Sequence, residues 1–181
     1  MKQTLILHPA VRHTAVANIE VDVDRSTGGR LRLRYQVEAP LIYLSIAGPA
    51  AAVRTDGLWQ TTCFELFVRV PSDATYTEYN FSPSSAWAAY RFEEYRERSA
   101  DLELSRSPEI AIDVGESHFV LEADLILPSP WNASTVQLGL SAVIEEADGT
   151  RSYWALGHPP GLPDFHHPDC FALTLAAPDA L

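Results

Sequence analysis

Residues 57–83 constrain the fold most, because apolar and polar side chains alternate along two consecutive segments of this stretch. In residues 63–70 every second side chain is apolar, which is the period of a β-strand with one face turned towards a core. A Pro-Ser-Asp turn follows and residues 76–82 alternate again, so the two segments predict a β-hairpin. Side chains two apart share a face of a strand, which places Glu65 and Phe67 together, opposite the fully apolar face. We expect function on the face that carries this carboxylate.

Short apolar runs recur along the rest of the chain and predict an all-β fold, an antiparallel β-sandwich of about nine to eleven strands. The chain has 181 residues and is 46% hydrophobic, which is enough for one core, so we expect a single domain over residues 1–181. Residues 85–98 combine helix-forming composition with strand-like alternation. We expect a short helix or irregular segment there and leave the type to tertiary context. Besides the hairpin and an opening strand, strands are expected near residues 19–23, 30–37, 110–114, 119–126, 136–144, 153–156 and 171–175.

The charge balance excludes several classes of partner. The 24 Asp and Glu against 13 Lys and Arg give a formal net charge of -11, and no basic run could neutralise a phosphate backbone, so we expect no nucleic acid. The apolar runs are too short to span a membrane. The first residues include only three consecutive apolar side chains, fewer than the roughly 7 of a secretory signal. We therefore expect a cytoplasmic protein in which Cys63 and Cys170 are free thiols.

Several segments carry a resemblance to a known family. They are Leu58-Trp59, Phe64-Glu65-Leu66-Phe67, Glu78-Tyr79-Asn80-Phe81-Ser82-Pro83, Trp87, and the closing segment from Trp154 to Phe171. In these segments the chain resembles bacterial DOMON-like domains related to family 9 carbohydrate-binding modules, over about residues 30–176. The resemblance implies a β-sandwich with a ligand cleft, in which sugar lies between two tryptophans while carboxylate, amide and basic side chains reach its hydroxyls.

The resemblance also assigns candidate ligand-binding residues. Trp59 matches the first stacking tryptophan, and Glu65 matches the sugar-contacting carboxylate. Trp154 is the candidate for the second tryptophan, and Trp87 is its rival. Asn80 stands near the place of the family's basic contact residue, where this chain departs from the pattern, and is a candidate polar contact.

The chemistry of this set suits a sugar. The C–H face of a pyranose stacks on an aromatic ring, and its hydroxyls pair with planar carboxylates and amides. Arg54 adds a basic side chain to the candidates. The alternative is structural: a tryptophan in a β-sandwich is more often a core residue, and a buried Glu65 needs a partner, for which Arg54, Arg69 and Arg91 are available.

A second unusual stretch, residues 158–169, holds three histidines and two aspartates. His158, Asp164, His166 and His167 are weak candidates for ligands of a transition metal. Adjacent histidines in a Pro-bounded loop usually point to opposite sides. The pattern therefore favours side chains that bond the main chain of the loop, and we predict no metal there.

Cofactors follow mainly from the resemblance. Family 9 modules hold structural calcium, so a bound Ca²⁺ is possible, although no Asp-rich loop with ligand spacing is present. Relatives on this scaffold bind haem. Haem with Met/His ligation is disfavoured because the sole methionine is Met1, and Lys2 is the only lysine.

No nucleophile elbow, P-loop, dinucleotide fingerprint or zinc-protease signature occurs in the sequence. A glycosidase needs two carboxyls across a cleft, and Glu65 has only Glu78 as a credible partner. We therefore expect a non-catalytic domain that binds a small ligand, a carbohydrate or a sugar-containing metabolite. The alternatives are a haem- or metal-binding DOMON-type domain, a protein-interaction β-sandwich that uses its acidic surface or a sheet edge, and a glycoside-acting enzyme.

Overall fold

Thirteen strands and four short 3₁₀ helices make up the computed structural model, which describes residues 1–71 and 73–178. The strands are β1 (Lys2–Thr4), β2 (Ile6–Leu7), β3 (Asn18–Arg25), β4 (Arg30–Glu38), β5 (Cys63–Arg69), β6 (Tyr76–Phe81), β7 (Trp87–Glu94), β8 (Glu97–Asp101), β9 (Glu109–Val114), β10 (His118–Ile126), β11 (Val136–Glu145), β12 (Arg151–Ala155) and β13 (Leu173–Leu175). The helices are η1 (Thr27–Gly29), η2 (Leu41–Tyr43), η3 (Leu58–Gln60) and η4 (Pro168–Cys170). No helix in the described ranges is long and apolar enough to cross a membrane.

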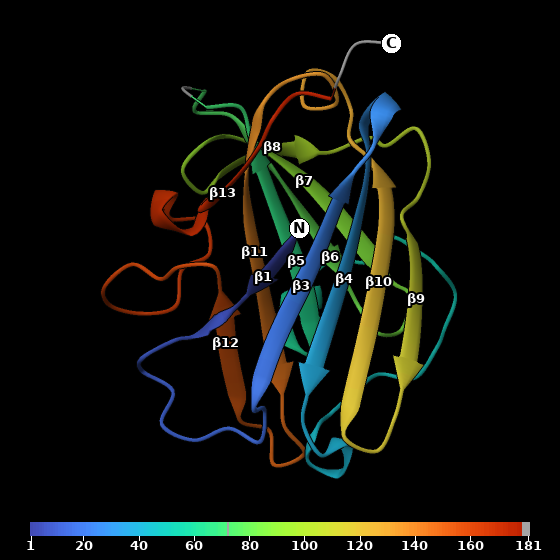
Figure 1. Ribbon diagram of the computed structural model, residues 1–181, viewed down its shortest axis with the longest axis vertical. Helices are drawn as coiled ribbons and strands as arrows, with labels where there is room; N and C mark the ends of the chain where they lie inside the picture. The colour runs from blue at the N-terminus through green and yellow to red at the C-terminus, as the bar shows by residue number, and fades with distance from the viewer. Residues whose placement is uncertain (72, 179–181) are drawn as a thin grey trace.

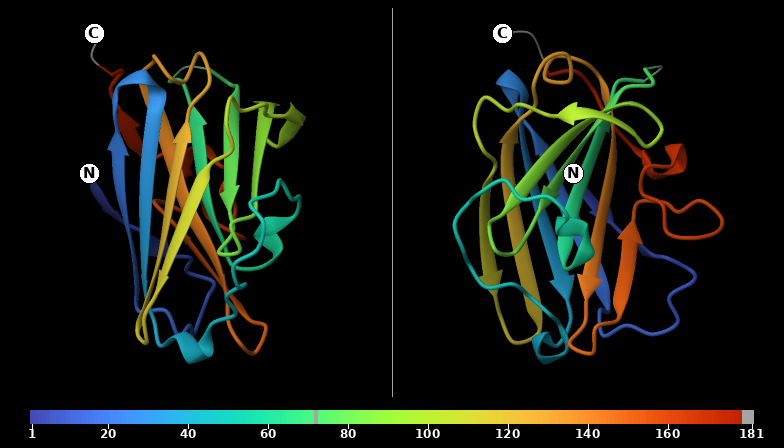
Figure 2. Two further views of the ribbon diagram at one scale, coloured as in Figure 1. Left: turned by 90° about the vertical axis from the view of Figure 1, so that its right-hand side faces the viewer. Right: turned by 180° about the vertical axis from the view of Figure 1, so that it is seen from behind.

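Two antiparallel sheets stack face to face (Figure 1), and the side view separates the two layers (Figure 2). One sheet has five strands in the order β1-β3-β4-β10-β9. The other has eight, in the order β2-β12-β11-β5-β6-β7-β8, with β13 paired to β11. The predicted antiparallel β-sandwich is confirmed. The strands outnumber the predicted nine to eleven partly because the opening segment divides into β1 and β2, which join different sheets.

The core lies between the sheets because alternate side chains of the central strands point inwards. On β5, Phe64, Leu66 and Val68 belong to the main apolar cluster. Tyr35 on β4 crosses this core, and its hydroxyl donates a hydrogen bond to the main-chain carbonyl of Glu65 at 2.8 Å. The apolar face of the predicted hairpin is therefore its inward face, as the alternation indicated.

The outer face of β5 and β6 is covered as well, although it points away from this core. Helix η3 lies in front of the sheet in the right-hand view of Figure 2. A second apolar cluster forms there, in which Phe67 of β5 joins Leu58 of η3 and Phe165 from the loop after β12. All side chains of β6 are consequently buried, half of them on each face. The space between this cover and the sheet contains the site described below.

Most of residues 85–98 belongs to strands β7 and β8, which corrects the expectation of a short helix or irregular segment there. Trp87 opens β7 opposite Phe81, and the pairing with β6 continues to Phe92 opposite Tyr76. The helix-forming composition is overridden because β6 presents a complete row of main-chain donors and acceptors to this segment. Strand β8 pairs with the other side of β7 and forms the edge of this sheet.

Candidate ligand-binding cavity

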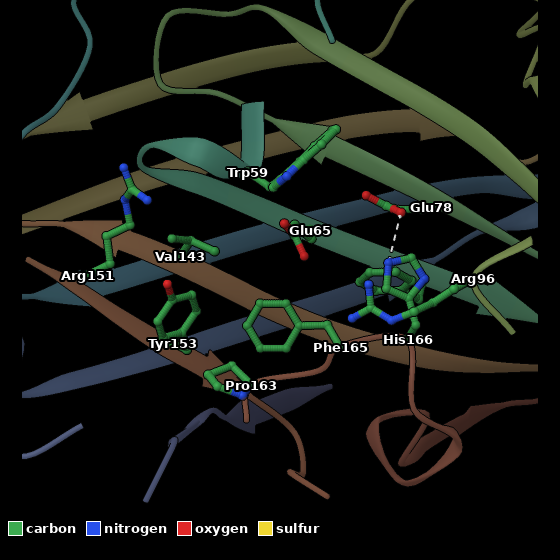
Figure 3. Close-up of a pocket in the computed structure, with 11 residues that line it drawn as sticks. Trp59, Glu65, Glu78, Arg96, Val143, Arg151, Tyr153, Pro163, Phe165 and His166 are labelled. Carbon is green, nitrogen blue, oxygen red and sulfur yellow. Dashed lines mark ion pairs between the residues drawn. The ribbon is translucent and has the colours of Figure 1, made fainter. Parts of the chain in front are cut away.

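A cavity of about 240 Å³ opens on the outer face of the eight-stranded sheet (Figure 3). Strands β5, β6, β11 and β12 contribute to it, together with η3, the turn between β7 and β8, and the loop after β12. Its lining consists of Trp59, Glu65, Phe67, Glu78, Arg96, Val143, Arg151, Tyr153, Pro163, Phe165 and His166. An adjoining hollow of about 280 Å³ shares four of these residues and adds Tyr90, Phe92 and Arg98.

Aromatic rings stand on two sides of the cavity. Figure 3 shows Trp59 on one side of Glu65, and Tyr153 and Phe165 on the other. Trp59 is 43% exposed, so its ring is available to a ligand. Gly57 precedes η3 with a φ of 79°, a backbone conformation that glycine adopts without strain. This turn therefore helps to set the indole beside the open face of the sheet.

Strand pairing brings two glutamates together on the floor. Glu65 lies opposite Asn80, and Phe67 lies opposite Glu78, in the β5–β6 ladder. Glu65 and Glu78 are therefore diagonal neighbours on one face, a separation that long side chains can bridge. Both side chains line the cavity, yet the residues are only 3% and 5% exposed.

Burial controls the charge of these two carboxyl groups. The pKa of Glu65 is raised to about 8, first by burial and then by the charge of Glu78, while a hydrogen bond from Ser141 opposes the shift. The pKa of Glu78 is raised to about 7 by burial, against a hydrogen bond from Asn80. Because two like charges in a dry site repel each other, the pair retains at least one proton at neutral pH.

Asn80 supports the cavity from below and does not line it. Its Nδ2 donates to Glu78 Oε1 at 2.6 Å, and its Oδ1 lies 3.3 Å from the Cys63 thiol, which donates to it. Asn80 has no exposed surface, so the structure makes it a positioning residue for Glu78. Cys63 and Cys170 are both buried and free, as predicted.

His166 faces Glu78, and its contacts favour one tautomer. The Tyr76 hydroxyl accepts from the main-chain N–H of Arg96 at 3.0 Å and lies 2.8 Å from His166 Nδ1, to which we assign its proton. The ring proton then resides on Nε2, which lies 3.6 Å from Glu78 Oε2. Burial lowers the pKa of His166 to about 4, so the ring is neutral at physiological pH.

The other two predicted tryptophans lie outside the cavity, which corrects the predicted set. Trp154 is 5% exposed and belongs to the main core, where its Nε1 donates to Ser152 Oγ at 3.0 Å. Trp87 is also part of that core. Because neighbours on a strand face opposite ways, Tyr153 occupies the cavity side of β12 beside the buried Trp154.

Arg54 is also placed away from the cavity. Its guanidinium donates to the main-chain carbonyl of Ala89 at 2.7 Å and pairs with Asp101 at 3.0 Å. It lies over the Trp87 ring at 5.7 Å from the centroid. Arg54 therefore fixes the segment before η3 against β7 and β8. None of the arginines weighed as a partner for Glu65 forms an ion pair with it among the described residues.

The four weak metal candidates are dispersed. His158 Nε2 lies 2.7 Å from the carbonyl oxygen of Ile6, and His167 Nδ1 accepts from the main-chain N–H of Asp169 at 3.2 Å. Asp164 accepts from the main chain two residues further on, and His166 faces the cavity instead. The predicted bonding to the main chain of the loop is thus seen for Asp164 and His167, whereas His158 contacts the main chain of β2. Within residues 1–71 and 73–178, no three potential metal ligands gather in one place.

Sequence reasoning missed several residues that line the cavity. Tyr153 could have been found, because Val143 pairs with both Cys63 and Tyr153 and so continues the outer face across three strands. Phe165 and Arg96 come from a loop and a tight turn, and alternation gives no signal there.

The sequence matches no protein-family model and no curated protein. Solved structures do match. A candidate carbohydrate-binding protein from Bacteroides uniformis superposes with a TM-score of 0.67 at 18% identity, covering 97% of this chain and 85% of that one. A family 9 carbohydrate-binding module from Caldicellulosiruptor kristjanssonii, solved with glucose, superposes with a TM-score of 0.52 at 16% identity.

The fold is CBM9-like. The aligned region covers 83% of this chain and 71% of the module's chain. A second structure of the module holds cellotriose. At these identities the likeness concerns the fold. It bears out the CBM9-like architecture that the sequence resemblance implied.

Proposed function

We propose that this chain is a non-catalytic carbohydrate-binding domain that holds a sugar in the cavity between Trp59 and the wall formed by Tyr153 and Phe165. One observation carries the proposal: the nearly buried Glu65 lines an open cavity whose two sides are aromatic. The CBM9-like neighbours, which were solved with glucose and cellotriose, support it.

The cavity offers the two kinds of contact that a pyranose uses. Its C–H faces pack on aromatic rings, here Trp59 on one side and Tyr153 on the other. Its hydroxyls donate to carboxylates and accept from arginine, for which Glu65, Glu78 and Arg151 are placed. The cavity volume of about 240 Å³ suits one sugar ring, and the adjoining hollow leaves room for a second unit.

A glycoside-acting enzyme is the second candidate, because Glu65 and Glu78 are two carboxyl groups with raised pKa values in one open site. A glycosidase needs one carboxyl group protonated and the other ionised at the working pH, and pKa values of about 8 and about 7 provide that state near neutral pH. We rank the enzyme second because the solved neighbours with bound sugars are carbohydrate-binding modules.

The narrower DOMON-like affiliation stays a prediction, and haem stays the disfavoured alternative ligand. A visible absorption spectrum of the purified protein tests it, since bound haem gives an intense band in the violet region. Ca²⁺ is tested in the same preparation by adding the ion and then a chelator while following the melting temperature.

Isothermal titration calorimetry with glucose, cellobiose and cellotriose tests carbohydrate binding. We expect binding that Trp59→Ala reduces by about 10-fold or more, because stacking on the indole is lost. Tyr43→Ala is the matched control, since Tyr43 is an exposed aromatic residue outside the cavity. The absence of binding by a broad panel of saccharides would overturn the proposal, as would equal losses in the two variants.

Incubation with chromogenic glycosides separates the binding domain from the enzyme. A binding domain releases no chromophore above the rate in buffer. Turnover that disappears in Glu78→Gln would favour the enzyme instead.

A further inference from the structure

The floor of the cavity carries negative charge that the protein itself leaves uncompensated. Glu65 accepts one hydrogen bond among the described residues, from Ser141 Oγ to Oε2 at 3.1 Å. Its Oε1 has no donor there, although the residue is 97% buried and lines the cavity. Glu78 accepts a hydrogen bond from Asn80, and its Oε2 lies 3.6 Å from Nε2 of His166, which is neutral and supplies no positive charge.

The arginines near the cavity are each engaged by another carboxylate. Arg96 pairs with Asp164 at 2.7 Å, and Arg98 pairs with Asp101 at 2.5 Å. Arg151 lies 3.6 Å from Glu145. None of these arginines comes within ion-pair distance of the floor glutamates in the described residues, although Arg96 and Arg98 act on Glu78 at longer range. The formal net charge of -11 adds a general attraction for cations.

Aromatic side chains complete this environment. The lining aromatic residues are Trp59, Phe67, Tyr153 and Phe165. The face of an aromatic ring attracts a cation, and the attraction grows when the cation is desolvated. A nearly buried carboxylate with a free oxygen, a second carboxylate beside it and aromatic rings around them are the contacts that a protonated amine uses.

We propose that the cavity selects a saccharide bearing a primary amine, with the ammonium group seated between Glu65 and Glu78 and against the aromatic walls. This inference rests on the proposed function, because it names the class of sugar that the same site prefers. Neutral sugars fill the same space but leave the charge of the carboxyl pair unchanged.

Binding of the amine is linked to proton release. In the empty site the two carboxyl groups share at least one proton, since burial raises both of their pKa values. When an ammonium group enters, that proton leaves to the buffer, and the pair changes from one negative charge to two while the ligand adds one positive charge. A neutral sugar binds without this exchange.

Other groups that face the pair do not supply the proton. From β5 and the loop after β12, Cys63 stays protonated, because burial raises its pKa well above the usual value, and His166 stays neutral. From β11, Ser141 does not ionise. Tyr35 on β4, Tyr76 on β6 and Tyr90 on β7 stay protonated, because burial raises the pKa of each hydroxyl. Further charged or titratable groups around the pair are Tyr153 and Arg151 on β12, Arg96 in the β7–β8 turn and Arg98 on β8.

Calorimetry at pH 7 with glucosamine, N-acetylglucosamine and glucose tests the inference. N-acetylglucosamine is the matched neutral control, because acetylation removes the charge from the same nitrogen. Each titration is run in phosphate and in Tris, whose different ionisation enthalpies report the protons released. We expect glucosamine to bind about 10-fold more tightly than either neutral sugar, with release of about one proton.

Two variants extend the experiment. Glu65→Gln and Glu78→Gln keep the shape of each side chain and remove its charge, and each is expected to bring the preference for glucosamine over glucose to within about 2-fold, whatever the absolute affinity. Equal affinities for all three sugars in the native protein would overturn the amine inference and leave carbohydrate binding standing. Failure of these three and of the wider saccharide panel would overturn both.

Discussion

Tyr153 and Trp154 are neighbours on β12 and face opposite sides of the eight-stranded sheet. The ring of Tyr153 lines the cavity, while Trp154 lies in the core and donates from Nε1 to Ser152 Oγ at 3.0 Å. One strand thus supplies an aromatic side chain to the ligand site and another to the interior. Substitutions at the two kinds of position are expected to have different consequences.

Alanine variants of Trp59 and Trp154 test this difference between a cavity position and a core position. Trp59→Ala is expected to weaken sugar binding by about 10-fold or more and to change the free energy of unfolding by less than about 1 kcal/mol, because the side chain is 43% exposed. Trp154→Ala removes a core side chain and is expected to cost about 3 to 5 kcal/mol. Urea denaturation and calorimetry on both variants provide the measurements. A Trp59 variant destabilised as strongly as the Trp154 variant would contradict the placement of the indole.

Glu65 and Glu78 are expected to lower the stability of the protein progressively as the pH rises from about 4.5 to about 8. The pKa values of Glu65 and Glu78 are raised from 4.5 to about 8 and about 7 in the folded state. Between these limits the folded state binds more protons than the unfolded state, so the free energy of unfolding decreases with increasing pH. From pH 6.5 to 8.5 this pair accounts for a loss of about 3 kcal/mol.

The double variant Glu65→Gln/Glu78→Gln checks this origin, because amides do not titrate. Its free energy of unfolding, measured in urea at several pH values, is expected to vary less over the same interval. Native and variant curves of equal slope would show that other groups cause the dependence.

His166 is expected to titrate with a midpoint near pH 4, because burial lowers its pKa to about 4. The unfolded chain takes up this proton near pH 6.5, so His166 makes the protein less stable as the pH falls from 6.5 to 4. Nitrogen NMR measures both the midpoint and the tautomer, and the Nε2–H form is expected. Tyr76→Phe removes the donor to Nδ1 and should populate the other tautomer. A midpoint above pH 6 would contradict the buried position of the ring.

Arg54 is expected to contribute to stability and not to ligand affinity. Its guanidinium bonds the carbonyl of Ala89 and pairs with Asp101, outside the cavity lining. Arg54→Ala should lower the free energy of unfolding by about 1 kcal/mol and leave sugar affinity within about 3-fold. Arg151→Ala, which does alter the lining, serves for comparison in the same calorimetric assay. An affinity loss in Arg54→Ala as large as in Arg151→Ala would mean that Arg54 reaches the ligand.

Alternation in the sequence is sufficient to predict the hairpin, because successive side chains of β5 and β6 point to opposite faces of the sheet. The sequence alone therefore places Glu65 on the outer face, and it lines the cavity. The same rule would have separated Tyr153 from Trp154. The resemblance instead favoured tryptophan by type, and the residue that it selected lies in the core.

Other features depend on long-range contacts that no local pattern carries. Arg96 enters the cavity from the turn between β7 and β8, and the place of this turn follows from the pairing of β7 with β6. Phe165 comes from a Pro-rich loop whose path over the sheet is set by packing against Phe67 and its neighbours. Local composition leaves helix and strand open in the first case and gives no direction in the second.

Because both faces of β5 are occupied, substitutions there fall into two independent sets. Phe64, Leu66 and Val68 hold the two sheets together, whereas Glu65 and Phe67 line the cavity. Evolution, or a designer, can thus retune ligand preference at one set of alternate positions without repacking the interior. This separation gives a physical route by which distant relatives could share one architecture while diverging in what they bind.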